Sequence, residues 1–276
     1  MINQWSPLQF LISKTVIIMI DKQGYIAVFD SGVGGISVLK RLIHRLPNEQ
    51  FLYYGDSANA PYGDRSEAEI LALTQAAVAK ILTRPVKALV IACNTATAVA
   101  IETLRQAYPD LPIIGIEPAI KPAAESYPAG KVGVMGTTAT LESSRFQALV
   151  ARHSDRCDFI PIPVPQLAPL VEQGIGNSRK TYKMLNKILL PYKDQLDAIV
   201  LGCTHYPFAT QSIRACVGLL PLLDGGIGTA NQVKKVLTRQ GLLNPGPGGL
   251  LWENSSPDPQ HLEVCKMLLS QPLEER

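Results

Sequence analysis

The sequence is poor in the features that mark several classes of protein. Charged residues make up only 18% of the 276 residues, the net charge is +3, and there is neither a basic run nor a cluster of aromatic residues. Nucleic-acid-binding domains carry concentrated positive charge, so this composition argues against a nucleic-acid partner. No apolar run reaches the ~20 residues that a membrane-spanning helix needs. The longest candidate, residues 8–20, is interrupted by Lys14, and no membrane association is predicted.

The cysteine patterns of disulfide and metal sites are also missing. The five cysteines are odd in number, widely separated and without a C-x-x-C pair. A chain of this length buries roughly 75% of its unfolded surface and needs no disulfides, so free thiols and a cytoplasmic location are expected. The C-x-H pair of Cys203 and His205 with one distant cysteine matches zinc spacing poorly, and no metal is predicted. The glycines after Asp30 do not follow G-x-G-x-x-G, so a dinucleotide cofactor is only weakly indicated.

The first twenty residues differ from the remainder of the chain. They lack the basic n-region and the small-residue cleavage site of a signal peptide. We interpret residues 1–20 as an N-terminal extension. Our hypothesis is that residues 1–18 are an upstream mis-start or a loosely attached segment, with Met19 as the natural start, which N-terminal sequencing of the natural protein would test.

Two short stretches, ALVIACNT at residues 88–95 and AIVLGCTH at residues 198–205, resemble each other. Each is an apolar, β-branched run that ends in a cysteine and small polar residues. Such a run is typical of a strand buried on both faces. Cys93 and Cys203 then lie just past the carboxyl ends of strands, where open α/β sheets hold their chemistry.

A second pair of stretches, IAVFDSGVGG and VGVMGTTAT, precedes the first pair at a similar distance. From Asp30 to Cys93 is 63 residues (93 minus 30), and from Thr137 to Cys203 is 66 residues (203 minus 137). An ancient duplication explains this spacing. The repeat predicts two similar halves that bring two thiols to one cleft.

Strand and helix patterns alternate along the chain, which predicts an α/β fold with mainly parallel sheets flanked by helices. We expect residues 21–117 and 226–276 to form a first domain, and residues 118–225 a second. Predicted strands cover residues 26–29, 51–54, 88–92, 113–116, 132–135, 198–202 and 219–223, with an edge strand at 250–253. Predicted helices cover residues 36–46, 66–81, 96–108, 141–152, 178–190, 229–240 and 260–269. Four prolines between residues 161 and 169 predict a stiff loop that continues to Glu172.

Two thiols that face each other can carry out proton transfer at carbon. One thiolate removes a proton while a thiol on the opposite face returns one, which inverts the centre without a cofactor. A free thiol of pKa about 8.5 is only ~3% ionised at pH 7, so its neighbours must adjust it. His205 lies two residues after Cys203 and shares its face if the segment is extended. Asp30, at the end of a strand and beside a glycine turn, is suited to bind an ammonium or to transfer a proton.

Other interpretations of these residues stay open. A single buried cysteine is usually a small core residue, and Cys157, Cys216 and Cys265 keep that interpretation. A Cys–His hydrolase with a single nucleophile is possible but would leave the second cysteine of the pair unexplained. A non-catalytic amino-acid-binding module would bind its ligand without exchanging the α-proton.

Taken together, these motifs resemble the cofactor-independent aspartate/glutamate racemase family. The matching stretches are FDSGVGGISV, YYGDSANAPYG, LVIACNTATA, VGVMGTTAT, PLVEQG and LGCTHYP, within residues 25–240, and WENSSPDPQHL matches more loosely. The resemblance implies two α/β domains related by a pseudo-twofold axis, with the active site in the cleft between them. It also implies a homodimer that converts L-glutamate to D-glutamate for peptidoglycan synthesis. Racemisation of aspartate or another amino acid by the same machinery is the alternative.

The resemblance further implies roles for individual residues. Cys93 would act on the D-enantiomer and Cys203 on the L-enantiomer. The auxiliary ionisable groups would be Asp30, Glu172 and His205. The carboxylates and the ammonium of the substrate would be held by Asp30, His205, Ser31, Tyr62, Gly63, Asn94, Thr95, Thr137, Thr140 and Thr204. All of these residues are expected on turns.

Overall fold

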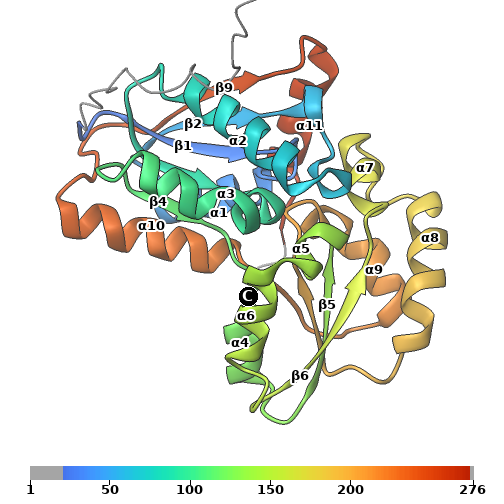
Figure 1. Ribbon diagram of the computed structural model, residues 1–276. Coiled ribbons are helices and arrows are strands. Elements are labelled where there is room, and N and C mark those ends of the chain that lie inside the picture. The colour runs from blue at the N-terminus through green and yellow to red at the C-terminus, as the bar shows by residue number, and fades with distance from the viewer. Residues whose placement is uncertain (1–20, 274–276) are drawn as a thin grey trace, which may run out of the picture.

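The computed structural model describes residues 21–273, so the N-terminal extension expected at residues 1–20 lies outside the described residues. Two parallel sheets, each with helices on both faces, confirm the predicted α/β fold (Figure 1). The first sheet has the order β4-β3-β1-β2-β9. Its strands are β1 (Tyr25–Asp30), β2 (Gln50–Gly55), β3 (Val86–Ile91), β4 (Ile113–Gly115) and β9 (Gly249–Asn254). The second sheet, ordered β6-β5-β7-β8, consists of β5 (Lys131–Gly136), β6 (Asp158–Pro163), β7 (Ala198–Leu201) and β8 (Leu222–Asp224).

The strand orders of the two sheets reveal the repeat that the sequence predicts. In the opposite direction, the order of the second sheet is β8-β7-β5-β6, which matches β4-β3-β1-β2 position by position. In each half, the strand that ends at a cysteine turn lies beside the strand that begins the half, β3 beside β1 and β7 beside β5. The last strand, β9, is an addition at the free edge of β2.

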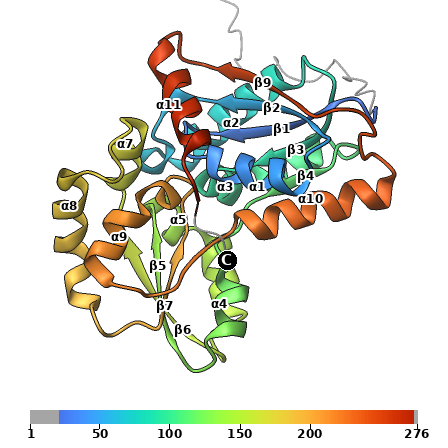
Figure 2. The same ribbon diagram turned by 180° about the vertical axis from the view of Figure 1, so that it is seen from behind.

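Helices cover both faces of each sheet, as Figure 2 shows from behind for the first sheet. One face of the first sheet carries α1 (Ile36–Arg45), α10 (Gly226–Gln240) and α11 (Pro259–Ser270), and the other carries α2 (Glu67–Ile81) and α3 (Asn94–Ala107). The second sheet is flanked by α4 (Ile120–Ser126) and α6 (Ser144–Ala151) on one side and by α8 (Arg179–Leu189) and α9 (Thr210–Val217) on the other. The short elements are α5 (Thr138–Glu142), α7 (Leu167–Glu172) and the 3-10 turns η1 (Ser57–Asn59), η2 (Tyr62–Asp64), η3 (Leu190–Tyr192) and η4 (Tyr206–Ala209).

Alternation along the strands divides the core between the two faces of each sheet. In β1, Ile26 and Val28 belong to the cluster on the α1 and α10 side, whereas Ala27 and Phe29 belong to the cluster under α2 and α3. This is the period-two arrangement of a strand that is buried on both faces. The first of these clusters continues into the second sheet through Leu201 and its neighbours. The two halves therefore share a continuous apolar core next to the cleft.

The proline-rich stretch is not a loop, which contradicts the prediction. Residues 158–163 form β6, the edge strand that pairs with β5, and residues 167–172 form α7. Prolines are tolerated in an edge strand because one side of that strand has no neighbouring strand to which an N–H group would have to donate a hydrogen bond. Pro169 lies in the first turn of α7, where N–H groups have no partner within the helix. Glu172 is consequently the last residue of a helix rather than part of a loop.

Three further elements differ from expectation. The helix predicted for residues 141–152 is divided into α5 and α6, because the Ser143 hydroxyl accepts a hydrogen bond from the Phe146 N–H and starts a new helix. Strand β8 begins only at Leu222, since Leu219 is 92% exposed and lies outside the sheet. Helix α4 was not predicted, because its seven residues include Pro122 and are too short for a clear periodicity.

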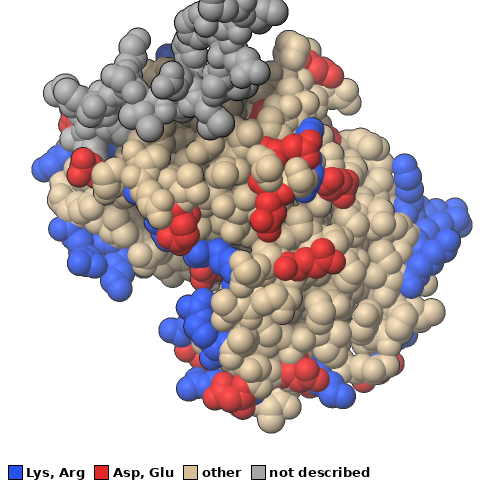
Figure 3. Space-filling model, in the orientation of Figure 1, with Lys and Arg blue, Asp and Glu red and all other residues tan. Residues whose placement is uncertain are grey.

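The positive charge is less evenly spread than the sequence suggests. Figure 3 shows Lys and Arg side chains gathered along α8 at one edge of the molecule. This patch consists of the exposed residues Arg179, Lys180, Lys183 and Lys187. Within residues 21–273, no helix is long and apolar enough to cross a bilayer.

Candidate active site

The two cysteine turns meet where the sheets face each other. Cys93 follows β3 and caps α3, whose Ala96 N–H lies 3.4 Å from its Sγ atom. Cys203 follows β7 by two residues. Both cysteines line one small cavity of about 20 Å³. The structure thus brings together two thiols that are 110 residues apart (203 minus 93).

Most of the predicted site residues line this cavity. Besides both cysteines, they are Ser31, Tyr62, Gly63, Asn94, Thr95, Thr137, Thr204 and His205. Asp30, Thr140 and Glu172 do not line it but contact residues that do. Two further lining residues, Pro61 and Ala168, were not among the predicted site residues. Nothing in the side chain of Ala168 signals such a position, because only the path of α7 brings it there.

Cys93 is buried in surroundings that keep its thiol protonated. Its Sγ atom donates a weak hydrogen bond to Ser31 Oγ at 3.5 Å. Burial and then the nearby Asp30 charge raise the pKa of Cys93 to about 12, while the hydrogen bonds with Ser31 and Ala96 act in the opposite direction. At neutral pH this residue is therefore poised to donate a proton.

Cys203 has different neighbours. Its Sγ atom lies 3.6 Å from His205 Nδ1, and His205 Nε2 lies 2.6 Å from Glu172 Oε1. Burial alone would lower the pKa of His205, but its hydrogen bonds with Cys203 and Glu172 raise it well above its usual value. The predicted contact between Cys203 and His205 is present, although the segment is a turn rather than an extended strand. The arrangement can pass a proton between sulfur, imidazole and carboxylate.

Asp30 ties the first half of the site to the second. Its carboxylate accepts hydrogen bonds from the Gly32 N–H at 3.0 Å and from Thr204 Oγ1 at 3.0 Å. Burial raises the pKa of Asp30, and the opposing effect of His205 does not cancel that rise. Ser37, the second residue of α1, adds a further link by donating to the Thr204 carbonyl at 2.9 Å. The glycine turn and the Cys203 turn are thereby held in a fixed relation.

A cluster of hydroxyl groups lies at the cavity. Thr95 Oγ1 lies 3.1 Å from the hydroxyls of both Thr137 and Thr140, and Thr137 donates to Thr140 at 2.9 Å. Tyr62 donates to Asp56 Oδ2 at 2.6 Å, which orients its ring beside the cavity. Asp56 was missed in the sequence because a carboxylate in a turn is usually solvated. These groups offer both donors and acceptors to a small polar ligand.

Two glycines allow the close approach of the halves. A Cβ atom on Gly32 would lie 1.9 Å from Glu172 Oε1, and one on Gly34 would lie 2.4 Å from His205 Nδ1. The Val33 N–H donates to the same Glu172 oxygen at 2.8 Å. The glycine turn after β1 therefore packs directly against the Glu172–His205 pair.

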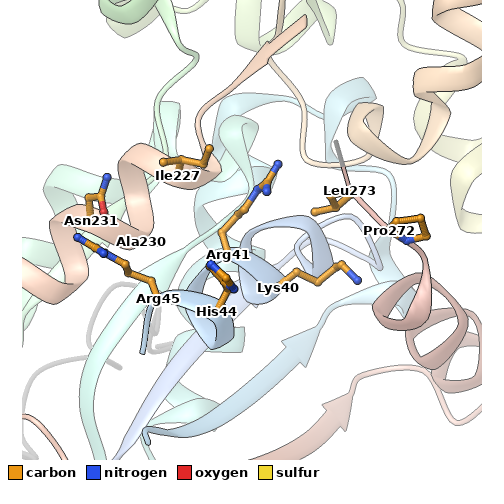
Figure 4. Close-up of a pocket in the computed structure, with 9 residues that line it drawn as sticks. All are labelled: Lys40, Arg41, His44, Arg45, Ile227, Ala230, Asn231, Pro272 and Leu273. Atoms are coloured by element: carbon orange, nitrogen blue, oxygen red, sulfur yellow. The ribbon is translucent and has the colours of Figure 1, made fainter. Parts of the chain in front are cut away.

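A larger cavity of about 790 Å³ lies away from the thiols, between α1, α10 and the segment after α11. It carries four basic residues of α1: Lys40, Arg41, His44 and Arg45, which Figure 4 shows spread across the groove. Lys40 donates to the Leu269 carbonyl at the end of α11, and Arg41 pairs with Asp224 at 3.9 Å. These contacts fasten α1 to its neighbours. No predicted site residue lines this cavity.

The thiol cavity is too small for an amino acid. A volume of about 20 Å³ has room for about one water molecule. A ligand that reaches both cysteines therefore requires the two halves to separate. Among the described residues, no group of three or more His, Cys, Asp or Glu side chains is arranged to hold a metal ion.

The chain is similar in sequence to known proteins. The glutamate racemase of Clostridium acetobutylicum is 44% identical over 251 residues, which cover 90% of this chain and 98% of the relative. The glutamate racemase of Clostridium novyi is 47% identical over 221 residues, which cover 79% and 85%.

Solved structures show the same fold. A glutamate racemase isoform of Bacillus anthracis superposes with a TM-score of 0.83 at 30% identity, covering 91% of this chain and 96% of that one. The Escherichia coli glutamate racemase, solved with L-glutamate and the activator UDP-MurNAc-Ala, gives a TM-score of 0.78 at 31% identity, covering 88% and 95%. Residues 30–233 match the family described as Asp/Glu/Hydantoin racemase, and the chain belongs to this family.

Proposed function

We propose that this protein is a glutamate racemase that interconverts L- and D-glutamate through its two cysteines. The relatives named above carry the name glutamate racemase, and the Escherichia coli structure contains L-glutamate. A further neighbour, the Francisella tularensis glutamate racemase, was solved with D-glutamate at 26% identity and a TM-score of 0.80, covering 92% of this chain and 96% of that one. These relatives support glutamate as the substrate.

The observation that carries the two-thiol mechanism is the shared cavity of Cys93 and Cys203. The two thiols come from equivalent strands of two repeated halves, β3 and β7. A substrate between the halves would present one face of its α-carbon to each thiol. Removal of the proton on one face and return on the other inverts the centre.

In this proposal each thiol serves one enantiomer, as the resemblance to the racemase family implies. For L-glutamate, the Cys203 thiolate takes the α-proton and Cys93 donates its own proton to the opposite face. The pKa of about 12 suits Cys93 to the donor role, because it keeps the thiol protonated until the carbanion forms. For D-glutamate the two roles are exchanged. Asp30 and the Glu172–His205 pair are the auxiliary groups in this proposal.

Substrate binding follows from the remaining polar groups. The hydroxyls of Ser31, Thr95 and Thr137 and the amide of Asn94 are donors suited to the carboxylates of glutamate. The buried Asp30 is the anionic group suited to the ammonium. Under the same proposal Tyr62, Gly63, Thr140 and Thr204 complete or support the pocket. A cytoplasmic homodimer that supplies D-glutamate to peptidoglycan synthesis remains the expected biological setting.

The direct test is incubation of the purified protein with L-glutamate in deuterated water without pyridoxal phosphate. We expect optical rotation to fall while deuterium enters the α-position of the D-glutamate formed. An unchanged rotation with L-glutamate, D-glutamate and L-aspartate would contradict the proposal. If only aspartate exchanged its α-proton, the protein would instead be an aspartate racemase that uses the same machinery. A product of different mass would instead favour the Cys–His hydrolase.

A further inference from the structure

A second cavity lies next to the thiol cavity, on the side of Glu172. Its volume is about 280 Å³, and it is bounded by the loop around Pro61, the end of α7 and the start of α11. Pro61 also lines the thiol cavity, so this residue forms a wall between the two. The outer rim is formed by exposed residues, including Gln173 and Gln260. The cavity thus leads from the surface to the carboxylate that contacts His205.

Two polar atoms on this cavity's residues lack partners. Glu172 Oε2 and His261 Nδ1 are buried, and neither has a hydrogen-bond partner among residues 21–273. Both residues line the cavity. Burial of a polar atom without a partner costs free energy, so such atoms are normally satisfied by water in a space that can hold it. A cavity of about 280 Å³ has room for several water molecules.

The proposed reaction requires the two thiols to exchange protons with solvent after each turnover. After L-glutamate becomes D-glutamate, Cys203 holds the substrate's proton and Cys93 has lost its own. In that state the protein accepts D-glutamate rather than L-glutamate. Before another L-glutamate can react, Cys203 must release a proton and Cys93 must regain one.

We propose that the cavity between α7 and α11 is the route by which the Cys203 side exchanges protons with solvent, and that His261 is its relay residue. The inference rests on the proposed racemase function. The α-C–H bond breaks as Cys203 S–H forms, and that proton then passes to the hydrogen-bonded His205–Glu172 pair. The pair releases one proton to water in the cavity, and His261 carries it toward the surface. The net change is one proton moved from Cys203 to solvent, with no redox step.

The proposal predicts a specific kinetic signature for His261→Phe, which removes the relay imidazole and narrows the cavity. At saturating L-glutamate in dilute buffer, we expect kcat to fall by about fivefold or more, because resetting of the thiols limits turnover. The value of kcat/KM should stay unchanged, because at low substrate the protein resets before the next encounter. Added imidazole, a small proton carrier, should restore kcat.

The control is Gln260→Ala, a neutral rim residue of the same helical turn, which should behave like the unaltered protein. If His261→Phe does not fold, Gln173→Trp narrows the mouth from the opposite wall and should give the same loss confined to kcat. Equal loss of kcat and kcat/KM without rescue by imidazole would overturn the proton route, as would an unchanged kcat in dilute buffer. Absence of racemisation in the unaltered protein would instead reject the proposed function, so the two failures are distinguishable.

Discussion

At the scale of single residues, Cys93 and Cys203 follow equivalent strands of the two halves but have different neighbours. Cys93 is surrounded by a hydroxyl, a helix amino terminus and a nearby carboxylate, whereas Cys203 contacts an imidazole that is itself hydrogen-bonded to Glu172. The proposed mechanism uses both thiols in each cycle and needs them in opposite protonation states. Burial and the nearby Asp30 charge keep the Cys93 thiol protonated before the substrate binds.

Replacement of either cysteine by alanine should nearly abolish racemisation. We expect the rate to fall by between about 10²- and 10⁴-fold for Cys93→Ala and for Cys203→Ala, because each removes one of the two proton-transfer groups. Chiral chromatography of the glutamate formed measures the effect. Cys157→Ala, a change away from the cavity, is the control. Near-normal turnover in either active-site variant would reject the two-thiol mechanism.

After burial, the charge of Asp30 is the largest influence on the ionisation of Cys93. Its negative charge raises the pKa of that thiol, so Asp30→Asn, which keeps a similar shape, should lower the pKa from about 12. Only the thiolate reacts with iodoacetamide. Alkylation of Cys93, followed by peptide mass spectrometry, should therefore become faster at a given alkaline pH in the variant. An equal or slower rate would contradict the proposed effect of the carboxylate.

Gly32 should tolerate no side chain. In Gly32→Ala the new methyl group would meet Glu172 Oε1 and displace it from His205, so we expect a large loss of racemase activity. The matched control is Gly228→Ala in α10, where the added Cβ would meet no atom within 4 Å beyond its own stretch of helix. That change should retain activity and raise stability by about 0.5–1 kcal/mol, because alanine favours helix over glycine. Activity assays and urea unfolding of both variants provide the comparison.

At the scale of secondary-structure elements, a buried ion pair holds the end of the first sheet that lies opposite the site. Lys87 in β3 pairs with Glu49, just before β2, and also donates to the carbonyls of Lys22 and Leu242. Glu49 in turn accepts from the Asn244 N–H at 3.0 Å. The pair therefore anchors β3, β2 and the segment that leads to β9 at one point.

Breaking this pair should destabilise the fold. Lys87→Met leaves the Glu49 carboxylate buried without its counter-ion, and we expect a loss of about 3–5 kcal/mol in the free energy of unfolding. Lys266→Met breaks the exposed pair with Glu263 and should cost no more than about 0.5–1 kcal/mol. Urea unfolding monitored by circular dichroism measures both. Equal midpoints for the two variants would show that the buried pair contributes little.

At the scale of the whole molecule, the repeat places the site between two halves that must separate to admit a ligand. Arg145 in α6 bridges them, with Nη1 3.0 Å from Glu102 in α3 and Nη2 2.7 Å from Glu117. The site at the carboxyl ends of both sheets is therefore closed partly by ion pairs on its outside. Such partly exposed pairs are individually weak, which suits a contact that opens in each cycle.

Loss of this bridge should favour the open state. For Arg145→Ala we expect KM for L-glutamate to rise by up to about fivefold, equivalent to about 1 kcal/mol, with little change in kcat. Raised salt should reduce the difference between the variant and the unaltered protein, because it screens the same pairs. Lys121→Ala, which breaks a pair within α4 only, is the control. Steady-state kinetics at two salt concentrations measure KM for each variant. An unchanged KM in Arg145→Ala would contradict the proposed role of the bridge.

The sequence predicts strands best where burial on both faces leaves an unbroken apolar run. The runs that end near Cys93 and Cys203 are strands β3 and β7, close to the predicted limits. The sequence predicts poorly where an element contains residues that usually disfavour it. Strand β6 contains prolines, which are accommodated only because that strand lies at a sheet edge. The helix end at Glu172 was missed because α7 is short and contains Pro169.

The amino-acid sequence by itself determined the α/β rhythm, the repeat and the residue types at the cysteine turns, since these depend on local patterns of burial and on backbone preference. Only the tertiary structure decided which of these residues meet. Asp30 contacts Thr204 across 174 positions, and Glu172 contacts His205 across 33. The pKa of Cys93 and the second cavity beside Glu172 likewise depend on the packing of distant segments. Desolvation and charge interactions are set by distance in space, which local sequence patterns do not specify.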